Sequence, residues 1–597
     1  MLLLNRIFSN EPSIWIFSLL MIALAVFLQN YRKKRILYFV PLAVATVHFL
    51  FFRFKGNIYH TRYYYGLFYI GAVVMALPVL TSLPVLAGRF TRIKKMFISL
   101  VTTFCILADV HTIVLPMVWN SAMRNHTKQG YVDSFISATH DMEKYYSLKD
   151  WKKIDIPALR EQFLPAIQRA EETQDEGLFA AAMFAYAFHF YDGHVNVWIP
   201  EEEPWLRCLN LLAGNDYGFS MLRVEGGKTI AVYVEEGSEA WENGIRNQTE
   251  ITGWNGQQID EAIEETEFIY LSSTMPVKAT EDLFKPIMLA TKGMWENGEK
   301  GIVADLIGNA SITDDSQRPP ALVRFIDEDG KEKEVKLASL GGGINRFEWA
   351  YILLDWVEYS AFPDLKNLET AMINEDTAYM VRNCEQSDTF FDVLSYFTNR
   401  NPKVRRQLIE ELTARKAEGM KKLIIDARSN SGGFWAIGVE TASLFSNRTY
   451  DISKRSSELF GKTKMIQTVT VPADGRFSDI EVLVLVDHYC VSAGDSFVKM
   501  LQQCPNVTVM GLTPSNCSCQ EVGGRSYLSN SICNIVYPVN WLYEVDETTR
   551  YIDTDEKREC TVPLDVQIPL TYELAQSLSD NYKTRDIILE KAVEYLK

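Results

Sequence analysis

The sequence predicts a multi-domain chain with four parts in order. We expect an all-α segment of four transmembrane helices over residues 1–120, a helical cap over 121–212, a β-rich domain over 213–342 and an α/β core over 343–597. Three observations predict this order. The first part holds long apolar runs, the third holds short alternating segments with turn glycines, and in the last part apolar strands alternate with helical stretches.

The first 120 residues contain four apolar runs, at 13–29, 36–52, 64–87 and 96–118. Runs of about 17–25 apolar residues match the thickness of a bilayer core, so we expect this segment to contact membrane lipid. A buried helical core domain is the alternative. The first run lacks a small-residue cleavage site, so we do not interpret it as a removable signal peptide.

Cationic links between the runs predict the orientation. The link "NYRKKR" (30–35) and the link "GRFTRIKK" (88–95) are the most basic, and such links lie in the cytoplasm. Both ends of the four-helix segment then lie on the extracytoplasmic side of the membrane. We therefore expect a multi-pass protein of a bacterial cell membrane, with everything after residue 120 extracytoplasmic.

Composition excludes some partners. A formal charge of −16 and a pI near 5.2 argue against nucleic acid, because phosphate binding needs clustered cations.

Six of the nine cysteines lie late in the chain, at Cys490, Cys504, Cys517, Cys519, Cys533 and Cys560. The sequence is compatible with disulfides between these six cysteines and also with unpaired thiols. The spacing in "SNCSC" is not that of a metal site, and we expect neither a metal nor a cofactor. The sequence does not indicate an oligomeric state.

Residues 130–190 have apolar positions at three- and four-residue spacing, which predicts helices. Asp192 and Gly193 then interrupt the pattern, and "HVNVWIP" alternates like a strand. His194 therefore lies where a helix gives way to a strand. A side chain at such a junction can face a cleft.

The β-rich part contains "ALVRFIDEDGKEKEVKL" (321–337), which predicts a hairpin with Asp-Gly at its turn. This part resembles a PDZ module. "YGFS", with Tyr217, Gly218 and Phe219, is similar to the carboxylate-binding loop, and residues 261–318 resemble an insertion. The resemblance implies capture of an extended peptide or its C-terminus by strand addition. A spacer or a gate is the alternative role.

In the core, "KKLIIDAR" and "EVLVLVD" are predicted strands, with a predicted helix before the first in "VRRQLIEELTARKAEGM" and another after Ser492 in "GDSFVKMLQQC". Strands that alternate with crossover helices predict a mostly parallel sheet, whose ligand sites lie at the carboxyl ends of the strands. The turns "RSNSGG" and "CVSAGD" both occupy that place. Consecutive glycines at Gly432 and Gly433 let backbone amides point into a cleft, as an oxyanion hole requires.

Ser492 opens the helix that follows "EVLVLVD", with the small residue Ala493 after it. It is a candidate nucleophile, and an N-cap serine is the alternative. A serine nucleophile needs a base. The histidines outside the apolar runs are His126, His140, His189, His194 and His488. The junction after Gly193 favours His194, because His189 falls on an apolar helix face and His488 faces its own strand end.

Taken together, these motifs resemble the carboxy-terminal processing (tail-specific) and tricorn-type serine proteases over roughly residues 130–597. "KKLIIDARSNSGG" is similar to the family's strand and glycine turn, "VLVDHYCVSAGDSF" to its nucleophile block and "VPLDVQIPLT" to its closing motif. The resemblance implies a core of the ClpP/crotonase-like type. It also implies that Ser492 is the nucleophile.

The resemblance offers two kinds of base. The processing branch uses a lysine, but Cys517 stands at that position. The tricorn-like branch uses a histidine and a late glutamate. "YDGHVNV" resembles the histidine segment of that branch and implies His194, and Glu559, just before "CTVPLDV", is the best match for the glutamate. Gly193 replaces a supporting serine of that branch. The resemblance thus implies a membrane-anchored serine endopeptidase of the Ser/His/Glu type, with oxyanion donors among Gly432, Gly433 and Ala493.

Two alternatives of another class remain. The missing lysine and Gly193 are also compatible with an inactive protein that binds peptides or apolar ligands on the same scaffold. A membrane sensor, whose helices transmit a signal from a peptide-reading domain, is the third possibility. The joint presence of Ser492, His194, Glu559 and both glycine turns favours the enzyme, because a binding protein does not need them.

Overall fold

The computed structural model describes residues 123–269, 274–295, 298, 300–342, 360–387, 392, 395, 398–459 and 462–597. The chain divides into two compact units after Ser121, and all the described residues belong to the second unit. The description below concerns this unit alone.

The helical cap consists of four helices, namely α6 (Tyr131–Tyr145), α7 (Ile156–Thr173), α8 (Glu176–Phe188) and α9 (Glu202–Ala213). Asp155 and Asp175 begin α7 and α8, since each carboxylate accepts a hydrogen bond from a backbone amide of the first turn. Every residue of α8 after Glu176 is buried, which explains its apolar sequence. The helices predicted over 130–190 are confirmed.

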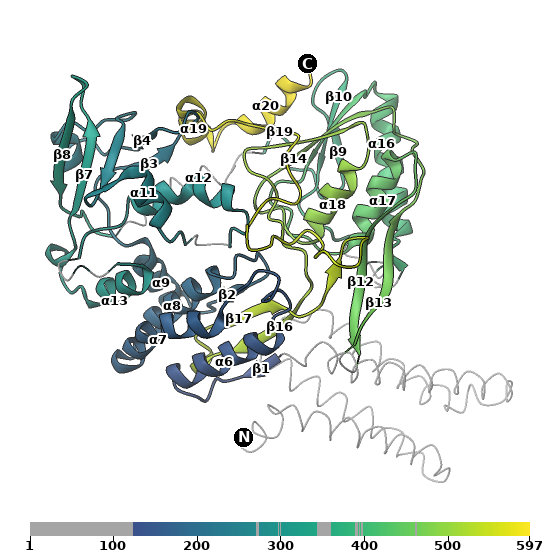
Figure 1. Ribbon diagram of the computed structural model, residues 1–597. Coiled ribbons are helices and arrows are strands. Elements are labelled where there is room, and N and C mark those ends of the chain that lie inside the picture. The colour runs from purple at the N-terminus through teal and green to yellow at the C-terminus, as the bar shows by residue number, and fades with distance from the viewer. Residues whose placement is uncertain are drawn as a thin grey trace, which may run out of the picture. The chain divides into compact units, whose positions relative to one another are not determined.

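A four-stranded sheet joins this cap to a late part of the chain. Its order is β1 (Met123–Asn125), β16 (Val522–Tyr527), β17 (Asn534–Pro538) and β2 (Asn196–Trp198). Figure 1 shows these strands beside α6 and α8. The strand predicted in "HVNVWIP" is β2. Because β2 pairs with β17, the residues before β2 lie near the residues before β16.

The central sheet has six strands. Its order is β19 (Val566–Gln567), β15 (Val507–Gly511), β14 (Glu481–Val486), β11 (Lys422–Asp426), β10 (Thr377–Val381) and β9 (Thr370–Met372). All neighbours pair in parallel except β9, which is antiparallel to β10. The mostly parallel sheet predicted from the alternation of strands and helices is confirmed.

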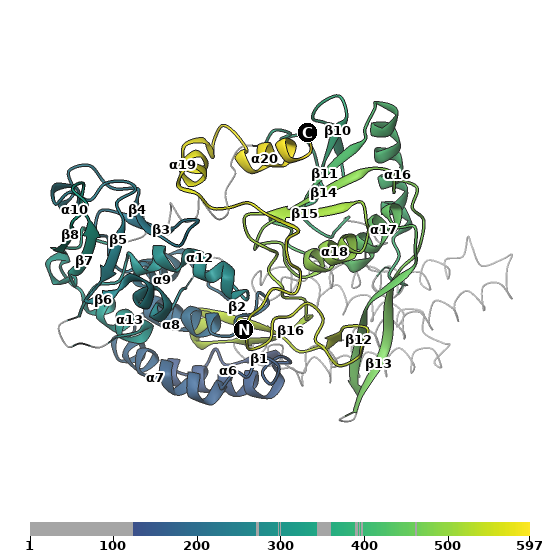
Figure 2. The ribbon, with the colours of Figure 1, turned by 45° about the horizontal axis from the view of Figure 1, so that its top comes forward.

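Helices cover both faces of this sheet (Figure 2). One face packs against α16 (Pro402–Ala417), α17 (Trp435–Phe445) and α18 (Ala493–Gln502), and the other against α19 (Tyr572–Asn581) and α20 (Ile587–Tyr595). Neighbouring residues of β11 point to opposite faces, with Ile425 in the first core and Ile424 in the second. A strand buried on both faces is apolar throughout, as "KLII" is.

Residues 215–342 form two small sheets with short helices. β3 (Ser220–Arg223) pairs with β4 (Thr229–Val232), and the second sheet has the order β6 (Gln257–Gln258), β5 (Ile251–Trp254), β7 (Ala321–Ile326) and β8 (Glu332–Leu337). The helices are α10 (Glu239–Glu242), α11 (Ile259–Glu265), α12 (Lys278–Leu289), α13 (Ile302–Ser311) and the 3-10 turn η2 (Asp315–Gln317). The hairpin predicted around Gly330 is β7–β8. The PDZ-like interpretation stays a prediction.

A long hairpin completes the described fold. β12 (Tyr450–Leu459) and β13 (Lys462–Val471) pair antiparallel, β18 (Leu542–Tyr543) extends their sheet, and the 3-10 turn η3 (Ser529–Ser531) precedes β17. Figure 1 shows this hairpin reaching away from α17.

The predicted fold class needs a correction in its first part. Among the described residues, no helix is both long and apolar enough to cross a membrane. The buried α8 has 13 residues, about 20 Å, which is shorter than a bilayer core of about 30 Å. The four predicted spans within 1–120 lie outside the described residues. A four-helix transmembrane segment is therefore not supported, and the fold is a mixed α/β fold with several sheets.

A buried ion pair fixes the end of β10. Arg382 donates two hydrogen bonds to Glu385, at 2.8 Å and 2.6 Å, and neither side chain is exposed to solvent. Glu385 also accepts a hydrogen bond from the side chain of Asn430 at 3.0 Å, and the Arg382 guanidinium lies 4.6 Å from the ring centre of Phe497 on α18. The pair thus links β10, the turn after β11 and the helix α18.

We predict that Arg382→Met lowers the free energy of unfolding by about 3–5 kcal/mol, because the Glu385 charge is then buried without its partner. Arg585→Met is the control, since its ion pair with Glu590 is largely exposed. Denaturant unfolding of both variants measures the difference. Equal stability of the two variants would contradict a structural role for the buried pair.

Candidate active site

Ser492 lies in the tight turn between β14 and α18, at the carboxyl end of the central sheet. Its backbone has φ 66° and ψ −123°, a strained conformation that residues with a side chain rarely adopt. An ordinary N-cap serine has extended dihedrals and needs no such strain. Ser492 is also only partly buried. Strained backbone is frequent at functional sites, and the nucleophile role of Ser492 stays a prediction.

The carboxylate of Asp495, in the first turn of α18, holds the backbone around Ser492. Oδ2 accepts hydrogen bonds from the amides of Ser492 at 3.0 Å and Ser518 at 3.2 Å, and Oδ1 accepts one from the amide of Cys517 at 2.8 Å. Burial raises the pKa of Asp495, and the hydrogen bonds from Cys517 and Ser518 oppose that rise. Asp495 accepts the amide of the N-cap residue Ser492 and also ties α18 to the turn 517–518.

Ser518 connects the nucleophile turn to the segment that carries His194. Its carbonyl oxygen accepts a hydrogen bond from the Ser492 amide at 3.0 Å, and its hydroxyl oxygen accepts one from the Gly193 amide at 2.7 Å. A Cβ atom at residue 193 would lie 2.0 Å from Oδ1 of Asn516, so this close approach requires glycine. Ser518 therefore brings a hydroxyl to the position where Gly193 replaces the expected serine.

His194 follows this glycine and precedes β2. Its amide donates a hydrogen bond to Asp192 at 2.9 Å, and the hydroxyl of Tyr146 donates to the other oxygen of that carboxylate at 2.9 Å. Within the described residues, the buried Nδ1 atom of His194 has no hydrogen-bond partner. Burial lowers the pKa of His194, and the charge of Asp192 opposes that fall. The imidazole is therefore neutral at pH 7, the form that a general base requires.

Gly432 and Gly433 form a second turn, after β11, that touches the first. Gly432 has a φ of +77°, and a Cβ atom there would lie 2.7 Å from Cβ of Ser492. Its amide donates a hydrogen bond to Asn430 at 3.0 Å. The amides of Gly433 and Ala493 donate to no acceptor in the part of the chain that the structure describes. Of the three predicted oxyanion donors, these two are open to a ligand oxygen.

Glu559 lies on the surface, where its carboxylate has no ion pair or hydrogen bond to any described residue.

The carboxylates of Asp192 and Asp553, by contrast, are buried. Asp553 accepts hydrogen bonds from the amide of Cys519 at 3.2 Å and from Nε2 of Gln520 at 3.0 Å. Burial raises the pKa of Asp553, and the charge of Asp192 adds to the rise. The role of Glu559 stays a prediction. The "YDGH" motif contains Asp192, whereas no sequence signal indicated Asp553.

No lysine occupies the position of the missing dyad base, which holds the buried Cys517. The nearby Lys152 is buried too, and burial lowers its pKa. Its Nζ atom donates three hydrogen bonds, to the carbonyl oxygens of Tyr191 at 3.0 Å and Thr554 at 2.9 Å and to the Thr554 hydroxyl at 2.7 Å. Because all three N–H groups are used, Lys152 anchors the segment before His194.

Two other histidines, His488 and His189, contact neighbouring side-chain rings or the backbone. His488 is buried against the rings of Phe284 and Tyr489, and burial lowers its pKa to about 4. His189 donates from Nδ1 to the carbonyl oxygen of Ala185 at 2.8 Å. Among the described residues, no three His, Cys, Asp or Glu side chains are grouped to hold a metal ion. Seven described cysteines are free thiols, namely Cys208, Cys490, Cys504, Cys517, Cys519, Cys533 and Cys560.

The predicted peptide-binding loop contributes to the core of its own domain. Tyr217 and Phe219 are buried, and the Tyr217 hydroxyl donates to the carbonyl oxygen of Pro319 at 2.7 Å. The amide of Gly218 donates to Asp216 at 2.8 Å. This amide is thus engaged inside the domain, and the binding role of the loop stays a prediction.

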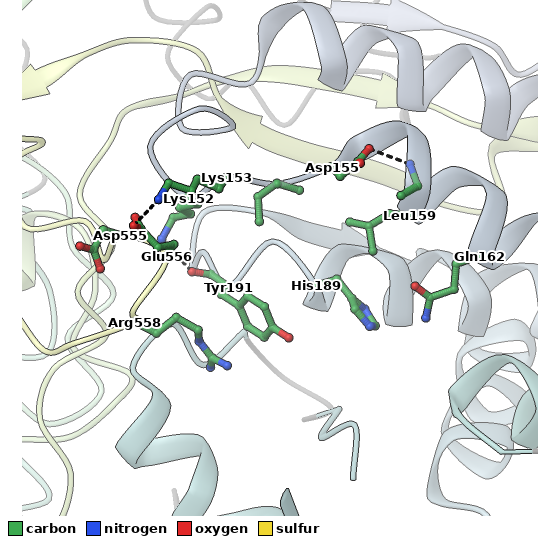
Figure 3. A pocket seen from close by; sticks show the side chains of 12 residues that line it. Lys152, Lys153, Asp155, Leu159, Gln162, His189, Tyr191, Asp555, Glu556 and Arg558 are labelled. Atoms are coloured by element: carbon green, nitrogen blue, oxygen red, sulfur yellow. Dashed lines mark hydrogen bonds and ion pairs between the residues drawn. The ribbon is translucent and has the colours of Figure 1, made fainter. Parts of the chain in front are cut away.

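A cavity of about 300 Å³ lies beside the segment that leads to His194 (Figure 3). Its walls include Tyr191 and Arg558, whose guanidinium lies 3.6 Å from the Tyr191 ring centre and pairs with Glu281 at 2.6 Å. The volume is at the lower end of the range for small-ligand pockets. The segments that carry His194 and Glu559 thus border one cavity.

Comparison with known proteins supports the resemblance. Residues 393–518, which include β11, β14 and Ser492, match the model of peptidase family S41. No curated protein matches the chain. The solved structures that are similar include mature CPAF complexed with lactacystin (12% identity, 76% of this chain, 98% of that chain, TM-score 0.43). They also include the photosystem II D1 C-terminal processing protease (14% identity, 76% and 97%, TM-score 0.29) and the tricorn protease (12% identity, 78% and 36%, TM-score 0.30). The match over residues 393–518 identifies a serine-type peptidase segment similar to family S41.

Proposed function

We propose that the chain is an endopeptidase in which Ser492 attacks the peptide bond and His194 is the general base. The observation that carries this proposal is the position of Ser518. Its two oxygen atoms accept hydrogen bonds from the amides of Ser492 and Gly193, and the latter contact joins residues 325 positions apart. A contact of that kind supports one site built from both motifs, because a separate helix cap and a separate loop need no such link.

In the proposed mechanism, His194 takes the proton of the Ser492 hydroxyl as its oxygen attacks the carbonyl carbon. The amides of Gly433 and Ala493 bind the negative oxygen of the tetrahedral intermediate, and the N-terminus of α18 adds a favourable dipole. His194 then gives the proton to the leaving amine. A water molecule, deprotonated by the same imidazole, hydrolyses the acyl-enzyme and restores Ser492.

For the group that supports the imidazole, buried Asp192 is a stronger candidate than exposed Glu559. The charge of Asp192 favours protonated His194, and its carboxylate binds the His194 amide at 2.9 Å. It therefore stabilises the imidazolium that forms during attack, and it orients the backbone that carries the ring. Tyr146 holds the other oxygen of this carboxylate, which keeps it in place.

The substrate is a protein or a peptide. If the loop with Tyr217, Gly218 and Phe219 binds a chain terminus, as its PDZ resemblance implies, a ligand carboxylate has to compete with Asp216 for the Gly218 amide. Capture at this loop is a separate step from cleavage. Loss of the loop's function would therefore raise KM for long substrates and leave cleavage of short peptides intact.

We predict that Ser492→Ala abolishes peptide hydrolysis and that His194→Ala lowers kcat by about 10²–10⁴-fold, the usual contribution of a general base. Hydrolysis of a fluorogenic peptide library by the purified full chain measures this loss. Ser316→Ala and His140→Ala are matched controls, because both side chains are exposed. Wild-type turnover by either site variant, with normal folding, would contradict the roles proposed for Ser492 and His194.

The pH profile of kcat/KM tests the base. His194 acts when neutral, so activity falls as pH drops through its pKa, and burial places that pKa below the ordinary 6.5. We expect an acidic limb with a midpoint below 6.5. Asp192→Asn should move the midpoint lower still, because the charge of Asp192 raises the pKa of His194. A profile that rises only at alkaline pH would instead indicate a lysine base.

The contact between the two turns predicts the effect of Gly432→Ala. The added Cβ atom would lie 2.7 Å from Cβ of Ser492, and displacement of a reacting group by about 1 Å can cost about 10²-fold in rate. We expect a loss of that size in kcat. Gly226→Ala is the control, since Gly226 has a similar φ of +89° with open space around it. Similar losses in both variants would show that strain, rather than the clash at Ser492, is responsible.

A further inference from the structure

Two cysteine thiols lie in contact next to the turn 517–518, which is hydrogen-bonded to Ser492. The Sγ atoms of Cys517 and Cys560 lie 3.5 Å apart, although 43 positions separate the residues in the chain. Cys517 is fully buried, whereas Cys560 is partly exposed. A small oxidant can therefore reach Cys560 from solvent, and the buried Sγ atom of Cys517 lies next to that of Cys560.

The surroundings of Cys517 favour its thiolate, the form that reacts with disulfides. Its pKa is lowered to about 6, first by the hydrogen bond with Cys560 and further by hydrogen bonds from Thr561 and Val562, while burial opposes the shift. Thr561 is itself held by a hydrogen bond to the carbonyl oxygen of Ile552. The donors around the sulfur are thus fixed by the fold.

The backbone at Cys517 belongs to the turn that supports Ser492. The Cys517 amide donates to Asp495 at 2.8 Å, and the next residue, Ser518, accepts the amide hydrogen bonds of Ser492 and Gly193. Cys560 lies in the separate segment that leads to β19. A covalent link between the two sulfur atoms would therefore fasten this turn to a distant part of the chain.

We propose that Cys517 and Cys560 form a reversible disulfide, made by exchange with a low-molecular-weight disulfide such as oxidised glutathione. The hydrogen bond with Cys517 raises the pKa of Cys560, so the Cys560 thiol passes its proton to the Cys517 thiolate as its sulfur attacks one sulfur of the small disulfide, and the expelled thiolate then takes up that proton. The Cys517 thiolate then attacks Sγ of Cys560 in the mixed disulfide and expels the second. Two protein thiols are oxidised, and one small disulfide is reduced to two thiols, so atoms and electrons balance.

The bond requires only a small movement. A disulfide has a sulfur–sulfur distance near 2.0 Å, so the two atoms have to approach by about 1.5 Å. The closed loop constrains the unfolded chain and stabilises the folded state. The cross-link also fixes the turn 517–518 in addition to its hydrogen bonds with Asp495. Oxidised protein should therefore unfold at a higher temperature than reduced protein.

The test equilibrates the full chain with oxidised or reduced glutathione, alkylates free thiols and maps peptides by mass spectrometry without reduction. We expect a peptide pair linked through Cys517 and Cys560 in the oxidised sample, and a Tm higher by about 2 °C or more than in the reduced sample. Cys560→Ser should lose both the link and the shift. Cys384→Ser, at another partly exposed cysteine, should keep both.

Two results would overturn the proposal. One is complete alkylation of Cys517 and Cys560 in the oxidised sample. The other is a Tm shift of equal size in Cys560→Ser, which would place the oxidation elsewhere. Neither readout uses hydrolysis, so the outcome is independent of the proposed peptidase mechanism.

Discussion

The organisation of the site depends on one buried carboxylate. Asp495 accepts hydrogen bonds from the amides of Ser492, Cys517 and Ser518, which come from two turns that are far apart in the sequence. Three amides on one carboxylate fix the strained backbone of Ser492 at the start of α18. They also place Ser518 where it can hold Gly193.

A second buried group supports the opposite side of the site. The pair of Arg382 and Glu385 holds the side chain of Asn430, whose oxygen in turn accepts the amide of Gly432. The same arginine packs on Phe497, one turn into α18. The glycine turn and the helix that Ser492 opens therefore share one buried support, although they follow different strands. Such a support suits a site that binds an oxyanion with fixed amides.

Local features of the fold were predictable from the sequence, and long-range features were not. The strands β11 and β14 and the helix α18 follow from apolar runs and turn residues, and their parallel pairing follows from the alternation with helices. Motifs in the sequence led to the prediction of Ser492 and His194 as site residues. The hydroxyl of Ser518 was missed, because its contact with Gly193 depends on how β2 and β16 meet in one sheet. Asp553 was missed because its importance lies in burial, which no short motif records.

A fluorophosphonate probe shows most directly whether Ser492 is an activated nucleophile, as we propose. The probe forms a covalent bond with a serine oxygen that a base has activated, and mass spectrometry of the digested protein locates the adduct. We expect one adduct on the peptide that contains Ser492, and we expect His194→Ala to lose that adduct. Folded protein that stays unlabelled at Ser492, or labelling that persists unchanged without His194, would contradict this proposal.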